Sequence, residues 1–295
     1  MSAVSLPIAI SRKTAPTRMS VYWRTARRYP IAFLGAFVVA LVVLVALLAD
    51  LITPYDPTWQ IAERLQPPNA DYILGADEFG RDIYSRIIYG ARISLYVGMV
   101  SVIFIAVPLG VTMGILAGYY GGWIDTLLSR SVDILFAFPS IVLAITIVGI
   151  LGPSLTNAMI AIGIVYAPTF ARIARGSTLA VVNLDYVMAS KTIGSKNLRI
   201  IIRHILPNIA APLIVQTTLA LSTAILAEAS LSFLGLGTQP PTPSWGTMLG
   251  TGRRYMELAP WVAIFPGVAI MIVVLGFNLA GDGLRDALDP RLREA

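Results

Sequence analysis

DYVMASKTIGSKNLRIIIRHILPN, residues 185–208, is a polar and basic island between two long apolar segments. Its basic side chains are Lys191, Lys196, Arg199, Arg203 and His204. Chains that cross a bilayer several times retain basic loops on the cytosolic side. The stretch therefore predicts a membrane protein in which this segment lies in the cytosol.

The same stretch predicts a short helix, a turn and a second, amphipathic helix. Asp185 is placed to cap the first helix, and Gly194 can take the backbone angles of a sharp turn. Pro207 ends the second helix or opens the next one. The apolar face of the second helix comprises Leu198, Ile201, Ile202 and Ile205. Its other face carries Lys196, Arg199 and Arg203.

The composition agrees with a membrane protein. Of 295 residues, 56% are hydrophobic and 13% are charged, whereas a soluble domain carries about 25% charged residues. The net charge of +6 arises from residues that flank apolar spans, which argues against nucleic-acid binding. With no cysteine and one histidine, the chain offers no disulfide and no metal site rich in Cys or His.

We predict an all-α integral membrane protein with six transmembrane helices and both termini in the cytosol. The expected spans are 31–52, 91–118, 124–150, 156–180, 208–234 and 260–281. This arrangement places most of the 22 Lys and Arg residues on the cytosolic side, as the positive-inside rule requires. The expected parts are a cytoplasmic basic tail (1–29), an anchor helix (30–52), an extracytoplasmic segment with an interfacial helix (53–90), a core of five helices (91–284) with a loop at 183–207, and a cytoplasmic tail (285–295).

The first apolar run, 31–49, follows a tail rich in arginine. It is longer than the core of a signal peptide, which has about 7–15 residues, and no small-residue cleavage site follows it. We therefore expect an uncleaved transmembrane helix.

The extracytoplasmic segment begins rich in proline and ends in a helical pattern in which Ile83, Ile87 and Ile88 share a face. The pattern predicts an amphipathic helix at the outer interface, or else the start of the next span held at headgroup level. In that span, Gly110, Gly114 and Gly118 recur every four residues. This spacing favours close helix packing over a site that lines a solute path.

Two of the acidic residues in the predicted spans, Asp133 and Glu228, are candidates for a functional role. Asp133 is expected to pair with Arg130 or Arg172, although an intramembrane carboxylate is also a candidate for a proton relay. Glu228, near the outer end of the fifth span, either faces a wet cavity that receives a cationic group, or makes a helix-end hydrogen bond or a pair with a partner subunit.

Residues 185–208 resemble the cytoplasmic EAA loop of ABC importer permeases. Met188, Ala189 and Ser190 occupy the Glu-Ala-Ala triplet, so the family's glutamate is missing, and Gly194 occupies the family's glycine. The resemblance implies a coupling helix that docks on an ATP-binding subunit. The residues it assigns to coupling are Met188, Ala189, Ser190, Gly194, Lys196, Arg199, Arg203, His204 and Pro207.

The outer segments are similar to those of C-type permeases of peptide and nickel importers. The match follows the pattern LG-x-D-x-x-GRD-x-x-SR-x-x-x-GAR-x-SL from residue 74. A second match covers 228–237 and the loop 243–249, which implies a gate or translocation path at Glu228, Ser244, Trp245 and Gly246. The charged and turn residues of the first match are Asp77, Gly80, Arg81, Asp82, Arg86 and Arg92.

This resemblance implies the type I ABC importer permease fold, in the cytoplasmic (inner) membrane of a bacterium. The implied solutes are di- or oligopeptides, glutathione or nickel complexes. The implied partners are a homologous B-type permease, two ABC ATPases, an extracytoplasmic solute-binding protein and membrane lipid, and no nucleic acid. The chain has no G-x-x-x-x-G-K-[ST] loop, so we expect it to be no enzyme and to hold no cofactor. ATP and Mg²⁺ would be bound by the ATPases.

The alternative is a secondary transporter driven by protons or sodium ions. Such folds show internal repeats and ionisable residues near the bilayer midplane. The sequence has no convincing repeat, and its acidic candidates are Asp133 and Glu228.

Overall fold

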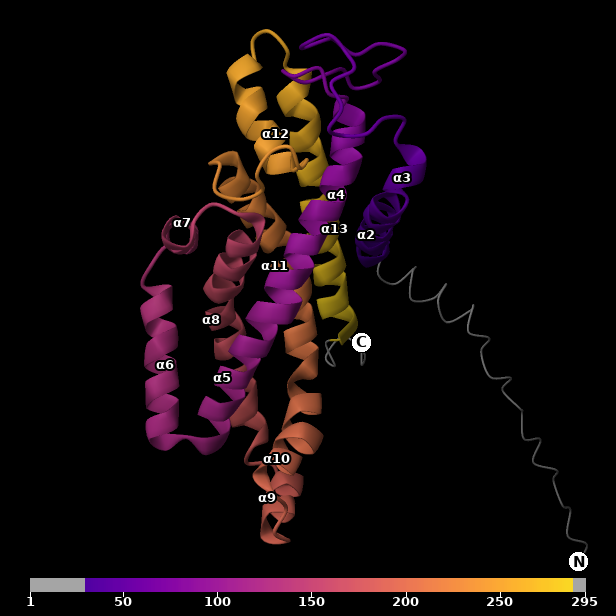
Figure 1. Ribbon diagram of the computed structural model, residues 1–295. Helices are drawn as coiled ribbons and strands as arrows, with labels where there is room; N and C mark the ends of the chain where they lie inside the picture. The colour runs from indigo at the N-terminus through magenta and orange to yellow at the C-terminus, as the bar shows by residue number, and fades with distance from the viewer. Residues whose placement is uncertain (1–29, 289–295) are drawn as a thin grey trace, which may run out of the picture.

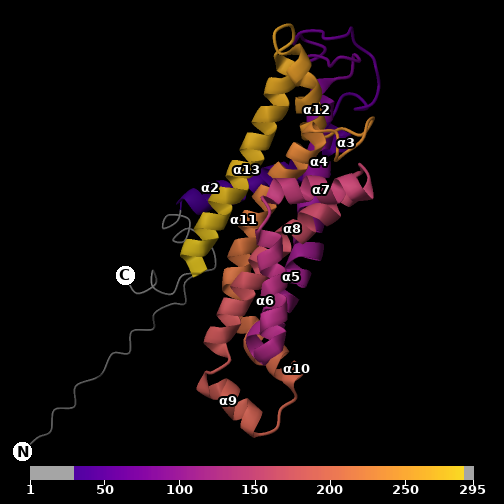
Figure 2. The same ribbon diagram turned by 90° about the vertical axis from the view of Figure 1, so that its left-hand side faces the viewer.

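The computed structural model describes residues 30–288, and this part of the chain is helical, without β-strands. The helices form an elongated bundle with α9 (Asp185–Thr192) at one end and α12 (Trp245–Gly252) at the other (Figures 1 and 2). We call these the α9 end and the α12 end. The basic tail predicted at 1–29 and the last seven residues lie outside the described part.

The other elements follow one another along the chain. In order they are α2 (Pro30–Leu47), α3 (Ala49–Ile52), α4 (Ile83–Met99), η1 (Val100–Ala106), α5 (Val107–Tyr120), α6 (Gly122–Phe136), α7 (Ser140–Leu151), α8 (Leu155–Val181), α10 (Asn197–Ile200), η2 (Ile201–Ile205), α11 (Leu206–Phe233), η3 (Arg253–Tyr255) and α13 (Trp261–Leu288).

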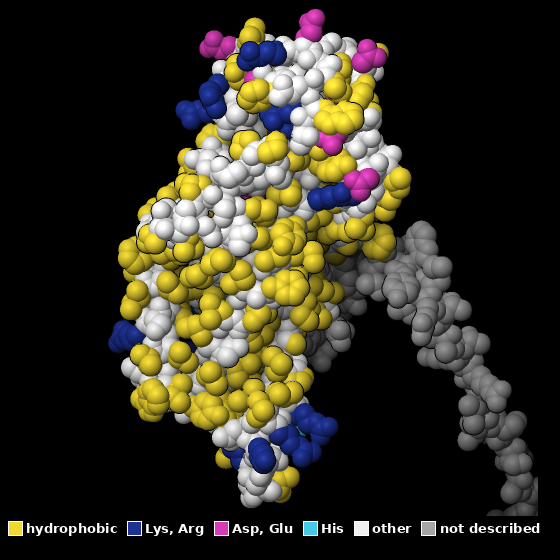
Figure 3. All heavy atoms as spheres, viewed as in Figure 1, with side chains coloured by type: hydrophobic (Ala, Val, Ile, Leu, Met, Phe, Trp, Pro, Cys, Tyr) yellow, Lys and Arg dark blue, Asp and Glu magenta, His cyan; other side chains and the backbone are white. Residues whose placement is uncertain are grey.

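The predicted all-α membrane fold is confirmed. Among residues 30–288, five helices are long and apolar enough to cross a bilayer, and the pair α6 and α7 makes a sixth crossing if it is one broken span. Figure 3 shows hydrophobic side chains over the middle of the molecule, with Lys and Arg gathered toward both ends and Asp and Glu toward the α12 end. This distribution matches a bundle whose middle lies in lipid.

The predicted third span, 124–150, contains a sharp break that the sequence analysis did not foresee. Helices α6 and α7 meet at an angle of 93°, and α7 runs across the bundle (Figure 2). The break falls just before Pro139, which lacks an N–H group and disfavours the α-helical conformation in the residue before it.

A separate interfacial helix at the end of the outer segment was also a wrong prediction. Helix α4 begins at Ile83 and continues through η1 and α5 to Tyr120 as one span. Since the side chain of Asp82 accepts a hydrogen bond from the N–H of Ser85 (2.8 Å), the helix has its N-cap here. The alternative, a span that starts early at headgroup level, describes this region better.

Proline residues inside two of the spans are preceded by π-helix. The π-helices η1 and η2 end just before α5 and α11, and Pro108 and Pro207 are each the second residue of the α-helix that follows. A proline ring clashes with the carbonyl four residues earlier, and the wider π turn is one way to accommodate it. The helix continues past both prolines, so Pro207 does not end the second helix of the basic stretch.

The prediction that Gly110, Gly114 and Gly118 mediate close packing is confirmed. They face α8, and a Cβ atom at Gly114 would collide with the backbone carbonyl of Ala171. Helix α2 makes a similar approach to α13, where Gly35 lies against the backbone of Leu279 and Ala280. The bundle is therefore held by backbones at close range, as expected for helices in lipid.

Gly114→Ala should destabilise the bundle by about 1–3 kcal/mol, because the added methyl group meets backbone that cannot move aside. Gly176→Ala on α8 is the matched control, since a Cβ there meets nothing within 4 Å. The measurement is thermal unfolding of both purified variants in the same detergent. Equal melting temperatures for the two variants would contradict the close α5–α8 contact.

Candidate functional site

The turn after α9 is a Schellman motif built on Gly194. The N–H of Ser195 donates to the carbonyl of Ser190 (3.1 Å), and the N–H of Gly194 donates to the carbonyl of Lys191 (3.0 Å). Gly194 has a φ of +78°, a conformation that side chains with a Cβ rarely adopt. The predicted glycine turn is therefore present. Asp185 lies in the first turn of α9, with Leu184 rather than Asp185 at the N-cap.

Most of the residues assigned to coupling line one open groove at the α9 end. The groove has a volume of about 760 Å³ and lies between α9 and the start of the helix that becomes α11. Its lining includes Ala189, Ser190, Gly194, Lys196, Arg199, Arg203 and His204. Met188 is 49% exposed on α9, and Pro207 is exposed on α11.

The apolar face predicted for the second helix was wrong in its register. Leu198 and Ile202 are exposed, by 67% and 53%, whereas Ile200, Ile205 and Ile209 are fully buried. The buried spacing is five residues and then four, because η2 contributes π turns between Ile200 and Ile205. A pattern search that assumes 3.6 residues per turn assigns the wrong face. The exposed leucine and isoleucine leave a mixed apolar and basic surface at this end.

Helix α9 and the segment that follows it are attached to α5 and to the helical run that becomes α11. Val187 is fully buried in the same apolar cluster as Ile200 and Ile205. At the end of α5, the hydroxyl of Tyr119 donates to Asn197 Oδ1 (2.9 Å), and Lys191 Nζ lies 5.1 Å from the centre of the Tyr119 ring. Residues of α9 and the segment that follows it therefore contact α5 and lie in the same apolar cluster as the helical run that becomes α11.

At the α12 end, the predicted outer motif forms a buried charge network. Asp77 Oδ2 lies 2.7 Å from Arg81 Nε and 3.4 Å from Arg86 Nε. Arg86 also donates to the carbonyl of Pro57 (2.9 Å). Glu78 lies 3.5 Å from Arg81, and burial, followed by the charge of Asp77, raises the pKa of the Glu78 carboxyl.

The remaining motif residues hold the outer segment in place. The carbonyl of Gly80 accepts hydrogen bonds from the N–H groups of residues 61 and 62. Arg92 pairs with Asp50 (2.8 Å) and also donates to backbone carbonyls near the end of α2. The hydrogen bond from Arg92 lowers the pKa of Asp50. The motif therefore ties the segment 53–82 to α4, and α4 to the end of α2.

Glu228 is fully buried in α11 and does not face an open cavity. Its Oε1 accepts hydrogen bonds from the hydroxyls of Ser232 (2.6 Å), Ser244 (3.0 Å) and Thr238 (3.2 Å). Of the two interpretations left open by the sequence, the hydrogen-bonded one matches this geometry. The carboxylate fixes the loop before α12 onto α11.

Trp245 and Gly246 complete this attachment. Trp245 is buried, and its indole N–H donates to the carbonyl of Ile87 on α4 (2.9 Å). A Cβ at Gly246 would collide with the carbonyl of Ala229. The four residues predicted at the gate are thus brought together, as a closed contact among α4, α11 and α12.

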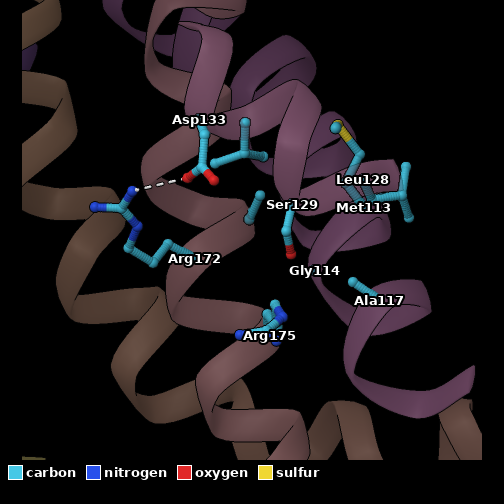
Figure 4. A pocket seen from close by; sticks show the side chains of 10 residues that line it. Met113, Gly114, Ala117, Leu128, Ser129, Asp133, Arg172 and Arg175 are labelled. Atoms are coloured by element: carbon cyan, nitrogen blue, oxygen red, sulfur yellow. Dashed lines mark ion pairs between the residues drawn. The ribbon is translucent and has the colours of Figure 1, made fainter. Parts of the chain in front are cut away.

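Asp133 pairs with Arg172, one of its two predicted partners, at 3.6 Å (Figure 4). The guanidinium of Arg172 also stacks 4.1 Å from the ring centre of Phe136. Both charged side chains are more than half exposed. They line a cavity of about 210 Å³ between α5, α6 and α8.

Sequence reasoning missed a second pair across the same cavity. Asp125 binds Arg175 through two hydrogen bonds, one of them 2.7 Å long. The available signal was spacing, because Asp125 and Asp133 lie eight residues apart on one face of α6, and Arg172 and Arg175 lie three apart on α8. Within residues 30–288, no group of three His, Cys, Asp or Glu residues is arranged to hold a metal ion.

Comparison with known protein families agrees with this architecture. Residues 110–294 match the family described as binding-protein-dependent transport system inner membrane component. Residues 17–68 match the N-terminal transmembrane domain of oligopeptide transport permease C.

The similarity to curated proteins covers nearly the whole chain. A dipeptide transport system permease protein of Alkalihalophilus pseudofirmus is 52% identical over 277 residues, which cover 92% of this chain and 90% of the relative. A glutathione transport system permease protein of Pectobacterium atrosepticum is 44% identical over 291 residues, 98% of this chain and 96% of the relative. Among solved structures, the inward-facing MetNI methionine ABC transporter shares the fold, with a TM-score of 0.54 and 23% identity over 70% of this chain and 98% of that one.

Glu228→Gln should fold like the wild type, because the amide oxygen can accept the same hydrogen bonds. Glu228→Leu should lower the free energy of unfolding by about 1–3 kcal/mol, because buried hydroxyl groups lose their acceptor. Thermal unfolding of both purified variants is the measurement. A well-folded glutamine variant that no longer transports would instead show that the negative charge itself has a functional role.

Proposed function

Because the chain belongs to the family of inner membrane components of binding-protein-dependent transport systems, we propose that it moves di- or oligopeptides, or related small solutes, into the cell. In this proposal it is the permease subunit of an ABC importer, and separate ATPase subunits drive it by alternating access. The observation that carries the proposal is the groove at the α9 end, with its basic and exposed apolar lining.

The α9 end has the chemistry of a protein-docking surface. Lys196, Arg199 and Arg203 lie at the groove, and beside them Met188 and Ile193 are exposed by 49% and 81%. Large apolar side chains among charges are typical of protein interfaces. We assign this surface to a groove on an ATPase subunit, and by the positive-inside rule we place it in the cytosol.

The attachment of α9 supports a mechanical role. The side chain of Val187 on α9 is buried, and a hydrogen bond joins Tyr119 on α5 to Asn197. ATP binding would bring the two ATPases together and move α9, and with it α5 and α11. ATP can drive this change only if it binds the ATPases more tightly in one of the two states.

A second, homologous permease would cover the α6–α7 face. The break before Pro139 is flanked by Phe136 and Phe138, which are 42% and 52% exposed. Lipid cannot satisfy the free backbone groups of such a break, whereas a protein surface or water can. The exposed pair of Asp133 and Arg172 likewise requires a polar surrounding, such as a solute path shared between two permeases.

The solute class follows from the relatives. Relatives with 44–52% identity are described as dipeptide, di/tripeptide and glutathione permeases. These solutes share a peptide backbone and free carboxylates. An extracytoplasmic binding protein would select the solute and deliver it at the α12 end.

An ion-driven transporter is less compatible with the acidic residues. Asp133 is already paired with Arg172, and Glu228 is buried among hydroxyl groups. Neither carboxylate lies free at an open cavity, as a coupling-ion site would require.

Affinity purification of the chain from native membranes in mild detergent, followed by mass spectrometry, tests the assembly. We expect a homologous permease and ATPases with a phosphate loop to co-purify. The double variant Arg199→Glu/Arg203→Glu should reduce ATPase recovery several-fold, because it reverses the charge of the groove. Arg253→Glu, exposed at the opposite end, is the matched control.

Full ATPase recovery with the double variant would contradict docking through this groove. Recovery of the chain without any ATPase, from membranes in which another ABC complex stays intact, would favour the ion-driven alternative.

Gly194→Val should uncouple ATP hydrolysis from solute uptake, because a β-branched residue cannot hold the positive φ that directs the chain from α9 into α11. Gly194→Asn is the matched control, since asparagine tolerates this conformation. The measurement is the ratio of uptake to ATP hydrolysis in proteoliposomes of the whole complex. Wild-type coupling in the valine variant would overturn the assignment of this turn.

A further inference from the structure

A cavity at the α12 end belongs to none of the sites assigned so far. It lies between residues 64–86 and residues 240–255, a range that includes α12, and its volume is about 310 Å³. The residues that line it are Arg64, Glu78, Phe79, Arg81, Arg86, Pro240, Thr242, Thr247, Thr251, Arg254 and Tyr255.

The lining carries an excess of positive charge. Four arginines face one carboxylate within the cavity, and Asp77 behind it is shared between Arg81 and Arg86. Arg254 is exposed at the rim and makes no ion pair within residues 30–288. Since arginine stays protonated at every physiological pH, the cavity attracts anions.

One buried arginine at this cavity does not use all of its donors in hydrogen bonds. The side chain of Arg86 is only 5% exposed, and its Nε lies 3.4 Å from Asp77 Oδ2 without forming a hydrogen bond. A buried unsatisfied donor costs free energy that an added acceptor can recover. The guanidinium is thus held in place by Asp77 and Pro57 while part of its donor capacity is unused.

The size and the walls of the cavity favour a small molecule over a bare ion. A volume of about 310 Å³ is at the lower end of the range for small-molecule sites, about 300–1,000 Å³. Phe79 and Tyr255 supply aromatic surface, and Thr242, Thr247 and Thr251 supply hydroxyl groups. A planar carboxylate matches the paired donors of arginine.

We propose that this cavity is an entry subsite that binds the carboxylate of a small peptide solute before the solute crosses the membrane. The inference rests on the proposed importer function and deepens it by naming the group that is recognised. Arg254 at the rim and Arg86 in the wall contact the carboxylate, and the aromatic and threonine side chains contact the remainder of the solute.

Binding of dialanine to the complex in nanodiscs of zwitterionic lipid, without binding protein or ATP, tests the proposal. Dialanine amide, which lacks the carboxylate, should bind about fivefold more weakly, as should dialanine to Arg254→Gln. Arg253→Gln is the matched control, because Arg253 is an exposed neighbour that does not line the cavity, and it should bind within twofold of the wild type. Because neither uptake nor ATP hydrolysis is measured, the result is independent of whether the complex transports.

Equal binding of dialanine and its amide would overturn the proposal, as would equal losses in the two arginine variants. Inorganic phosphate that binds as tightly as dialanine would indicate a general anion site and would also overturn it. If the wild type binds no dialanine, while Arg254→Gln but not Arg253→Gln weakens capture of the solute-binding protein, the cavity receives an acidic side chain of that partner instead.

Discussion

The bilayer offers no hydrogen bonds to an exposed backbone, and the rest of this structure depends on that constraint. It requires long helices through the apolar middle of the molecule and moves irregular segments to the two ends. The irregular outer segment is held by buried ion pairs around Asp77. The loop before α12 is held by hydrogen bonds from hydroxyl groups to Glu228. The break before Pro139 is the exception, and it lies on a face with large exposed apolar side chains.

Charge has a different role at each end of the bundle. At the α12 end, the charged groups around Asp77 and the carboxylate of Glu228 are buried and have partners, so they fix the loops to the spans. At the α9 end, Lys196, Arg199 and Arg203 are exposed and free of ion pairs within residues 30–288. Between the ends, two pairs connect α6 to α8 across a small cavity. Paired charges stabilise geometry here, whereas the exposed ones are available to partners.

Much of the architecture could be predicted because hydropathy, charge bias and one glycine turn are local properties of the sequence. The spans, the packing of Gly114 on α8 and the turn at Gly194 all followed from short windows. The buried face of the segment after α9 could not be predicted in this way, because π turns change the helical period. The contacts of Glu228 with Ser244 and of Asp125 with Arg175 could not be predicted either. They join residues 16 and 50 positions apart, and spacing within one helix does not show which segments meet.

The π-helix η2 also affects how the residues before it are oriented around the axis of α11. Each residue of an α-helix turns the chain by about 100° around the axis, and a π turn contains one residue more than an α turn. The wider turn thus accommodates one extra residue, so Ile200 and Ile205 share a buried face although they lie five positions apart. Removing one residue from Ile201–Ile205 and closing the turn to α-helix would therefore leave Lys196 and Arg199 at nearly the same angle around α11. A deletion in the α-helical part of the same run would instead rotate the basic surface by about 100° relative to the bundle that crosses the membrane.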